Sequence, residues 1–450
     1  MVAMRNPLAA MMIGLLLLVP GTARAQVRDA TMVDVLDELR RLRAELDQTR
    51  GEVHKLRGEL DQLKTAEAAK AIEPTEQAPS ISTLVEMLQS QVAEQAQTKV
   101  ESESRLPVKI FGTIHSSTAF NSGDANWLDN PNVAGPPQTP TGSFTSTARQ
   151  TRLGVRTEGL AIGQWQGSGA VVFDFFGGIP AFQTGQVMGL PRLLYAWARF
   201  ERDGRAMHVG QDEMILAPRN PTSVAAYSFP LLFRSGNLYL RLPQARVESR
   251  LAGKAGAELR ATVGIVAPVG GDFAGTNYTF VPPALGGERS RHPGVQARLA
   301  WTQGDSRQGA SAGVSGHYSR ERRVDGLFPS WAAAFDFDVQ GTRVGVTGEA
   351  FVGLNIDAFG GALGQTARTA GGFVETRLRA ATRWDIVVGG GTDRPGSGVT
   401  LSRNLSGYSS LTFHLTPEVA TSFEYRWLET TAASLRRHNH HVNWALTYGF

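Results

Sequence analysis

The sequence predicts an all-β membrane protein, in which a 16-stranded antiparallel transmembrane β-barrel follows an N-terminal α-helical coiled coil. Three observations predict this class. From residue 106 onward, apolar and polar residues alternate with the period of two that a strand requires. Over residues 29–66, apolar residues instead recur at heptad spacing. No run of about 18 apolar residues follows the first part of the chain, so no membrane-spanning helix is predicted.

Residues 1–25 have the three parts of a secretory signal peptide. Arg5 supplies positive charge, residues 8–19 form a short apolar segment, and Ala23-Arg24-Ala25 matches the cleavage pattern. The alternative, a transmembrane anchor, needs a longer apolar segment. The mature chain is therefore predicted to begin at Gln26.

Residues 26–66 are predicted to form a parallel coiled coil in the periplasm. Two sets of mainly apolar residues repeat every seven positions and lie three positions apart, as coiled-coil core positions do. Glutamates precede basic residues by five positions, which is the spacing of interchain ion pairs in a parallel bundle. The pairs are Glu38–Arg43, Glu45–Arg50, Glu52–Arg57 and Glu59–Lys64. A single amphipathic helix on the barrel would not need matched charges, so a homo-oligomer is predicted. Residues 67–105 are a predicted linker and short helix.

Residues 106–450 are predicted to form the barrel. Strand-like segments begin near residues 108, 147, 163, 192, 205, 237, 256, 293, 308, 330, 342, 371, 382, 404, 418 and 437. Short and long connections alternate between them. The predicted short ones are 158–162, 202–204, 253–256, 303–308, 340–342, 380–381 and 416–417, and the long ones are near 121–146, 176–191, 213–236, 269–292, 320–329, 356–370, 391–403 and 429–437. Outer-membrane barrels have short periplasmic turns and long external loops, so both barrel ends are predicted to be periplasmic.

The last strand shows the alternation most clearly. Its aromatic and aliphatic residues share one parity and its small or polar residues share the other. The first set comprises Val442, Trp444, Leu446, Tyr448 and Phe450. A soluble sandwich would bury that set in a core, whereas an outer-membrane barrel turns it toward lipid. A final aromatic strand that ends in Phe resembles the C-terminal signature read by the outer-membrane assembly machinery. Phe450, Tyr448 and Trp444 are therefore the predicted assembly signal.

Parity also predicts which charged residues face the lumen. Residues 105–450 carry 33 basic and 25 acidic side chains, a balance of +8, and almost all of the basic ones are arginine. The arginines with inward parity include Arg152, Arg156, Arg246, Arg377 and Arg379. The acids with inward parity include Asp174, Asp336, Asp338, Glu349, Glu375 and Glu424. Rings of arginine favour anions in a pore. The alternative is that many of these arginines only pair with lumen acids.

The connection at 213–236 is too apolar for a solvated loop and also carries Arg219 and Arg234. Such a loop must bury itself, either inside the barrel or against a neighbouring subunit. The interior is predicted, with the loop as a constriction and its two arginines as further pore residues.

Three segments resemble the DcaP-like outer-membrane porins. They are residues 148–154 (ARQTRLG), 209–212 (VGQD) and 236–246 (GNLYLRLPQAR). Across about residues 35–450, the resemblance implies a trimeric channel for dicarboxylates and other small anions, with a periplasmic coiled coil. It also makes Arg152, Arg241 and Arg246 candidate pore residues. Arg241 and Arg246 have opposite parity, so both can face the lumen only if a bulge lies near Pro243.

Two other classes of protein stay open. A barrel enzyme would need a catalytic constellation at its rim; His438, His440 and His441 cluster, but no Gly-x-Ser-x-Gly elbow occurs. A trimeric adhesin-like attachment protein also has a coiled coil, but its barrel is only a short anchor. The chain has no cysteine, and no catalytic residue, cofactor, metal ligand or nucleic-acid motif is predicted. The predicted location is the bacterial outer membrane. The predicted partners are its lipid, its assembly machinery, small anionic solutes and, in a homotrimer, two further copies.

Overall fold

The computed structural model describes residues 108–178, 189–254, 256–269, 284–305 and 308–450. The predicted signal peptide, coiled coil and linker, residues 1–105, lie outside these ranges. In the described residues, no helix has both the length and the apolar character needed to cross a membrane.

Strands make up most of the described chain. They are β1 (Val108–Asn121), β2 (Ser143–Thr147), β3 (Arg152–Ile162), β4 (Trp165–Asp174), β5 (Arg192–Arg202), β6 (Arg205–Glu213), β7 (Arg241–Lys254), β8 (Ala257–Val266), β9 (Gly294–Gly304), β10 (Gly309–Arg323), β11 (Gly326–Gln340), β12 (Val344–Leu354), β13 (Arg368–Ala381), β14 (Trp384–Pro395), β15 (Leu401–His414), β16 (Val419–Ala432) and β17 (Leu435–Gly449). Short helices α4 (Gly286–Arg289), η1 (Asp357–Phe359) and η2 (Gly361–Gly364) lie in the connections.

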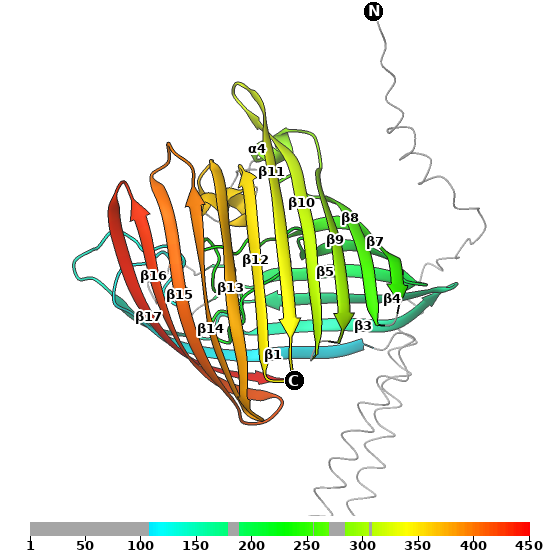
Figure 1. Ribbon diagram of the computed structural model, residues 1–450, viewed down its shortest axis with the longest axis horizontal. Helices are drawn as coiled ribbons and strands as arrows, with labels where there is room; N and C mark the ends of the chain where they lie inside the picture. The colour runs from blue at the N-terminus through cyan, green and yellow to red at the C-terminus, as the bar shows by residue number, and fades with distance from the viewer. Residues whose placement is uncertain (1–107, 179–188, 255, 270–283, 306–307) are drawn as a thin grey trace, which may run out of the picture. The chain divides into compact units, whose positions relative to one another are not determined.

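The strands form one closed antiparallel barrel. Each strand from β3 to β17 pairs with the next one along the chain, and β17 pairs with β1 to close the wall. Figure 1 shows this order, from β1 in cyan to β17 in red. Two segments share one place in the wall, because β2 pairs with residues 117–121 of β1 and β3 pairs with residues 108–113. The predicted 16-stranded antiparallel barrel is confirmed.

Several predicted connections are wrong in position. The connections predicted to be long at 320–329 and 429–437 are tight turns. β10 ends at Arg323 and β11 begins at Gly326, and β16 ends at Ala432 and β17 begins at Leu435. Polar residues at outward positions hide these strand ends from a pattern based on apolar alternation. The turn predicted at 158–162 lies within β3, where the register shifts at Gly159, and the turn itself follows Ile162.

Other strand boundaries differ by a few residues. The turn predicted at 380–381 follows Ala381, and the strand predicted from 237 begins at Arg241. The residues before Arg241 leave the wall and belong to the connection from β6. The ends of a strand depend on backbone pairing with its neighbouring strands. Side-chain alternation in the sequence does not show where this pairing stops.

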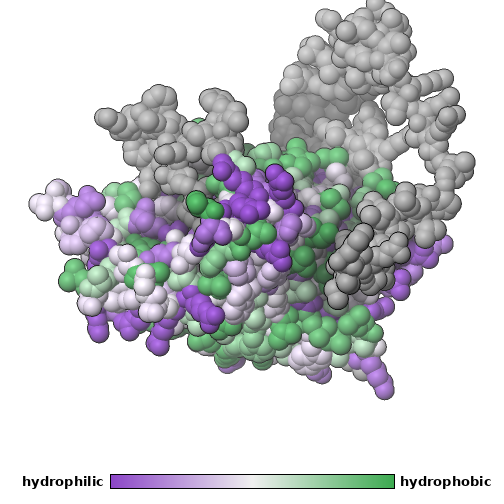
Figure 2. Space-filling view, turned by 90° about the horizontal axis from the view of Figure 1, so that it is seen from above, coloured by the Kyte–Doolittle hydropathy of each residue, from purple (hydrophilic) through white to green (hydrophobic). Residues whose placement is uncertain are grey.

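The outer wall is apolar, as the alternation in β17 predicts. Trp444, Leu446 and Tyr448 are 41–47% exposed, whereas Asn443 and Ala445 between them are fully buried. The neighbouring strands follow the same rule, with exposed valine, leucine, isoleucine and aromatic side chains on the outside. Figure 2 shows hydrophobic residues exposed on the surface between hydrophilic ones. An outer surface of this kind is stable against hydrocarbon.

Phe450 lies at the seam where the barrel closes. Its backbone N–H donates to the carbonyl of Gly112 (3.1 Å), and its own carbonyl accepts from the Gly112 N–H (3.0 Å). A Cβ atom at Gly112 would lie 2.7 Å from the Phe450 ring, so the ring packs over a site that only glycine leaves open.

We expect Phe450→Ser to lower the amount of folded barrel in the outer membrane, because the variant loses the terminal aromatic group and its packing at the seam. The measurement is outer-membrane protein level together with heat-modifiable mobility on gels. Leu435→Ser is the matched control, since Leu435 is an exposed apolar residue (64%) at the other end of β17. Equal levels for Phe450→Ser and the wild type would reject the role of Phe450 in assembly.

Candidate functional site: the constricted lumen

The connection between β6 and β7, residues 214–240, folds into the barrel interior. Met214, Leu216 and Leu238 are almost fully buried and pack against Ile356 and Phe359, which belong to the connection after β12. The apolar residues of this interior loop therefore build a small core inside the barrel. The prediction that it lies in the interior is confirmed, and the alternative of a subunit contact is not needed to explain its apolar character.

Arg219 fixes the first part of the interior loop to the wall. Its Nε donates to Asp336 of β11 (3.1 Å), which also accepts from Arg298 of β9 (2.7 and 3.0 Å). The backbone N–H groups of Arg219 and Leu238 donate to Glu349 of β12 (3.3 and 3.4 Å). Arg219 thus acts as a strut between the loop and the wall. This agrees with the alternative given in the sequence analysis, in which lumen arginines pair with lumen acids.

The middle of the interior loop covers two further carboxylates. Thr222 donates to Glu375 of β13 through its backbone N–H (2.8 Å) and its hydroxyl (2.7 Å). The hydroxyl of Ser223 donates to Glu424 of β16 (2.6 Å). Asp336, Glu349, Glu375 and Glu424 are at most 4% exposed. Four acids with inward parity are therefore placed beneath the loop and not at the open lumen.

The loop then reaches the opposite part of the wall. Gln150, between β2 and β3, accepts from the N–H groups of Tyr227 (2.7 Å) and Ser228 (2.9 Å) and donates to the carbonyl of Ala225 (2.8 Å). The ring of His115 in β1 lies 2.8 Å from the carbonyl of Val224. These contacts fix the loop across the lumen.

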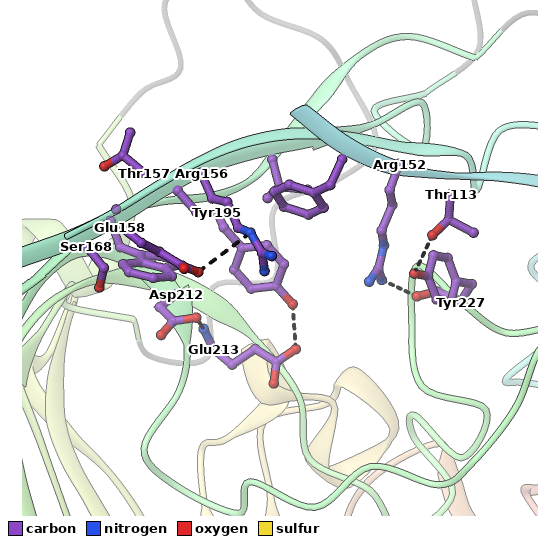
Figure 3. Close-up of a pocket in the computed structure, with 16 residues that line it drawn as sticks. Thr113, Arg152, Arg156, Thr157, Glu158, Ser168, Tyr195, Asp212, Glu213 and Tyr227 are labelled. Atoms are coloured by element: carbon purple, nitrogen blue, oxygen red, sulfur yellow. Dashed lines mark hydrogen bonds and ion pairs between the residues drawn. The ribbon is translucent and has the colours of Figure 1, made fainter. Parts of the chain in front are cut away.

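The space beside the loop is a cavity of about 480 Å³. Residues of β1 and β3–β6, including Glu213 at the end of β6, form its wall. Tyr227 of the interior loop lies on its other side (Figure 3). Arg152 points across it, with its guanidinium 4.0 Å from the centre of the Tyr227 ring and a hydrogen bond to the Tyr227 carbonyl. Arg156 lies 3.6 Å from Glu158, and both side chains are about half exposed. The predicted inward positions of Arg152 and Arg156 agree with this geometry.

Arg241 reaches the same region without a bulge. The register between β6 and β7 is continuous from Arg205 to Glu213, which pairs with Arg241, so the bulge expected near Pro243 is absent there. Arg241 lies where the chain leaves the wall, and its guanidinium is 4.9 Å from the rings of both Tyr195 and Tyr239. The exit of the interior loop, and not a change of register, turns Arg241 inward.

Arg246 faces the lumen, but two neighbouring carboxylates compensate its positive charge. It contacts Asp212 (3.1 Å) and Glu248 (3.1 Å), and Glu248 also binds Arg199 (2.8 Å) and Arg260 (3.5 Å). This network holds β5–β8 together on their inner face. Arg246 therefore has the wall-pairing role that the sequence left open as the alternative.

Arg377 and Arg379 lie near the turns at the strand ends and not beside the interior loop. They line a second pocket of about 560 Å³ with Asp385 and His414. Arg377 binds Asp385 (2.5 Å), and Arg379 donates to the carbonyl of Gly341 (2.8 Å). Both have the inward parity that the sequence predicts, but β13 ends at Ala381, so they lie close to the turn at the end of this strand.

Arg234 lies at the far end of the interior loop. Its guanidinium is 5.7 Å from the Phe233 ring, and its carbonyl accepts from Asn404 of β15 (2.8 Å). Burial lowers the pKa of Arg234, and the nearby carboxylate of Asp357 opposes that shift. Arg234 is thus interior, but it does not line the cavity beside Arg152.

Sequence parity missed Tyr195, one of the aromatic residues of the cavity. The register between β4 and β5 shifts at Leu194, which turns Tyr195 inward, and its hydroxyl donates to Glu213 (2.7 Å). Gln150 was also missed, because it lies in the break between β2 and β3. Neither a bulge nor a broken strand leaves a signal in the alternation.

The histidines near the last strand do not form a site. His438 and His440 are exposed on the outer face of β17, whereas His441 is buried on the inner face. In the part of the chain that the structure describes, no group of three or more His, Asp or Glu side chains could hold a metal ion.

No protein-family model and no curated protein matches the sequence. Solved structures do match. The outer membrane channel DcaP of Acinetobacter baumannii has a TM-score of 0.62 and 14% identity, over 77% of this chain and 99% of that one. OmpF of Salmonella typhi, solved with daunomycin, has a TM-score of 0.51 and 11% identity, over 77% and 98%. At these identities the likeness concerns the fold, and the chain has the barrel fold of these outer-membrane proteins; the resemblance of the sequence to DcaP-like porins is confirmed at that level.

Proposed function

We propose that this protein is an outer-membrane porin that lets small hydrophilic solutes diffuse through its lumen and prefers small anions such as dicarboxylates. The observation that carries the proposal is the interior loop. It narrows the lumen and covers four carboxylates, and it leaves the cavity of about 480 Å³ beside Arg152 and Arg156. A closed wall with an apolar exterior and a polar interior is what such a channel requires.

The charges at the cavity support the anion preference. Two of its three acids are paired with arginine, since Glu158 faces Arg156 (3.6 Å) and Asp212 pairs with Arg246 (3.1 Å). Glu213 is hydrogen-bonded by the Tyr195 hydroxyl (2.7 Å) and keeps its negative charge. Among the described residues, no ion pair joins a carboxylate to Arg152 or Arg241. Their positive charge is therefore less compensated than that of Arg246, which contacts two carboxylates. In a narrow lumen with low-dielectric walls, salt screens that charge less than at an open surface.

Single-channel recording in planar bilayers tests the function. With a salt gradient across the bilayer, the reversal potential should have the sign of an anion-preferring pore. Absence of conductance from folded, heat-modifiable protein would reject the channel. A reversal potential of the opposite sign would be compatible with the channel function but would reject the anion preference.

The proposed topology puts both barrel ends and the coiled coil in the periplasm, with the interior loop entering from the outer side. The heptads and matched charges of residues 26–66 support a parallel homotrimer. In detergent, the full chain should therefore appear as a trimer by native mass spectrometry. Deletion of residues 26–80 should lower the trimer fraction and leave the barrel folded, because the barrel satisfies its own backbone hydrogen bonds. A monomeric full-length chain would reject this assembly.

A further inference from the structure

Basic side chains gather on the outer face of the barrel near one end of β13–β17. Arg403 of β15 pairs in register with Thr431, and Thr431 pairs with Arg436 of β17, so the two arginines lie on one row across three strands. Arg394 of β14 and Arg368 of β13 follow at the same end, with Arg394 opposite Ala370. Arg368, Arg394 and Arg436 are exposed, and Arg403 is 32% exposed. These four residues, with His438 and His440, are called the outer basic patch.

The outer basic patch is built around one carboxylate. Glu429 of β16 is only 5% exposed, and it contacts Arg403 and lies 3.7 Å from Nδ1 of His438. Two aromatic residues lie under the histidines: the Trp427 ring stacks with His438, and the Tyr425 hydroxyl is 2.8 Å from Nδ1 of His440. The single acid leaves the patch with excess positive charge.

The rest of the circumference has no such patch on β1–β9. At the corresponding ends of β1, β2, β4, β5, β8 and β9, exposed apolar residues face outward. They are Phe120, Phe144, Phe173, Leu193, Ile265 and Val295. Arg320 and Arg322 of β10 also have outward parity at this end, so outward arginines occur there on β10 and on β13–β15 and β17, and not on β1–β9. Where a barrel wall meets lipid, an arginine facing the hydrocarbon is costly, and it becomes favourable only near the headgroups.

The aromatic residues beside the outer basic patch are of the type found in a headgroup region. Trp427 and Tyr425 have amphipathic rings of the kind found at a membrane interface. Arg436 lies four residues beyond His440 along β17, about 13 Å farther from the apolar part of the strand at about 3.3 Å per residue. Planar guanidinium groups spaced along adjacent strands bind phosphate oxygens through paired N–H donors.

We propose that the outer basic patch binds the phosphate groups of a glycolipid in the external leaflet of the membrane. The proposal rests on the proposed location in the outer membrane, but not on conduction. The lipid would lie along β13–β17 with its acyl chains against the apolar wall and its phosphorylated sugars at Arg368, Arg394, Arg403 and Arg436. The patch would fix one side of the barrel to the external leaflet.

Native mass spectrometry of the full chain in detergent tests the patch, with bis-phosphorylated lipid A as the probe. The triple variant R368Q/R394Q/R436Q should bind it about 10- to 100-fold more weakly at low salt, since each arginine near an anionic surface contributes several-fold. Arg403 is kept, because Glu429 would otherwise lose its main partner. The matched control R202Q/R205Q/R383Q removes three arginines that are exposed at the opposite strand ends, and it should bind as the wild type does.

Three results would overturn the proposal. They are equal binding by the triple variant, equal binding of dephosphorylated lipid A by the wild type, and displacement of the lipid by millimolar inorganic phosphate, which would indicate a simple anion site. Heat-modifiable mobility checks that each variant is folded. Bilayer recording of the triple variant separates the lipid-binding proposal from the channel proposal. Loss of lipid binding with unchanged conductance supports lipid binding by the outer basic patch and does not affect the proposed channel function.

Discussion

Removal of residues 220–236 should raise the single-channel conductance several-fold. This segment carries the contacts of Thr222 and Ser223 with the wall and places Tyr227 against Arg152, so its absence opens the part of the lumen that the interior loop occupies. A short Gly-Ser linker can join the ends, because the side chain of Asn237 donates to the carbonyl of Arg219 at 2.6 Å. The strut from Arg219 to Asp336 stays in place.

The same deletion should weaken the anion preference. It uncovers Glu375 and Glu424, which are buried beneath the loop in the intact chain, so negative charge reaches the open lumen. The measurement is the reversal potential in a salt gradient, on channels that show heat-modifiable mobility.

A milder variant tests whether the conductance depends on the contacts between the interior loop and the wall. T222A/S223A removes only the two hydroxyls that bind Glu375 and Glu424, and it should give a smaller increase in conductance with more current noise. The matched control S402A/S409A removes two exposed hydroxyls from β15, and it should behave as the wild type does. A full deletion whose conductance equals that of the wild type would show that the loop does not constrict the pore.

Replacing Arg152 and Arg156 with alanine should move the reversal potential toward cations and weaken block by succinate. Both guanidinium groups face the cavity, and Arg152 has no ion-pair partner among the described residues. Their loss leaves Glu158 without its neighbour at 3.6 Å, which adds a second change in the same direction. The difference from the wild type should shrink in molar salt, where the Debye length is about 3 Å.

The charge-conserving variant R152K/R156K separates net charge from arginine geometry. It should keep the reversal potential close to that of the wild type but bind succinate more weakly, because an ammonium group lacks the planar fork that matches a carboxylate. If R152A/R156A keeps wild-type selectivity, these two residues do not set the preference, and Arg241 becomes the next residue to test.

The number of strands and the outer face of the last strand could be predicted from the sequence. Trp444 and Asn443 show why: lipid on one side and water on the other impose an alternation that each strand carries on its own. The wrong connections lie where that constraint ends. At Arg322 and Arg436 the strands continue beyond the apolar wall, and backbone pairing with the partner strand, not alternation, keeps them extended.

The arrangement of charges in the lumen was decided by tertiary structure. Parity gives Arg152 and Arg246 the same inward direction, yet Arg246 is held by Asp212 and Glu248 while Arg152 stacks on Tyr227. Those partners come from other strands and from the interior loop.

The sequence alone determined that the 213–236 segment had to be buried, because it is too apolar for solvent. Only the folded chain decided which acids it covers, since Ser223 and Glu424 are separated by 201 positions. Strand alternation is a local property that each segment carries by itself. The charge that a solute meets depends on which distant side chains pair across the lumen, and closure of the barrel is what brings them together.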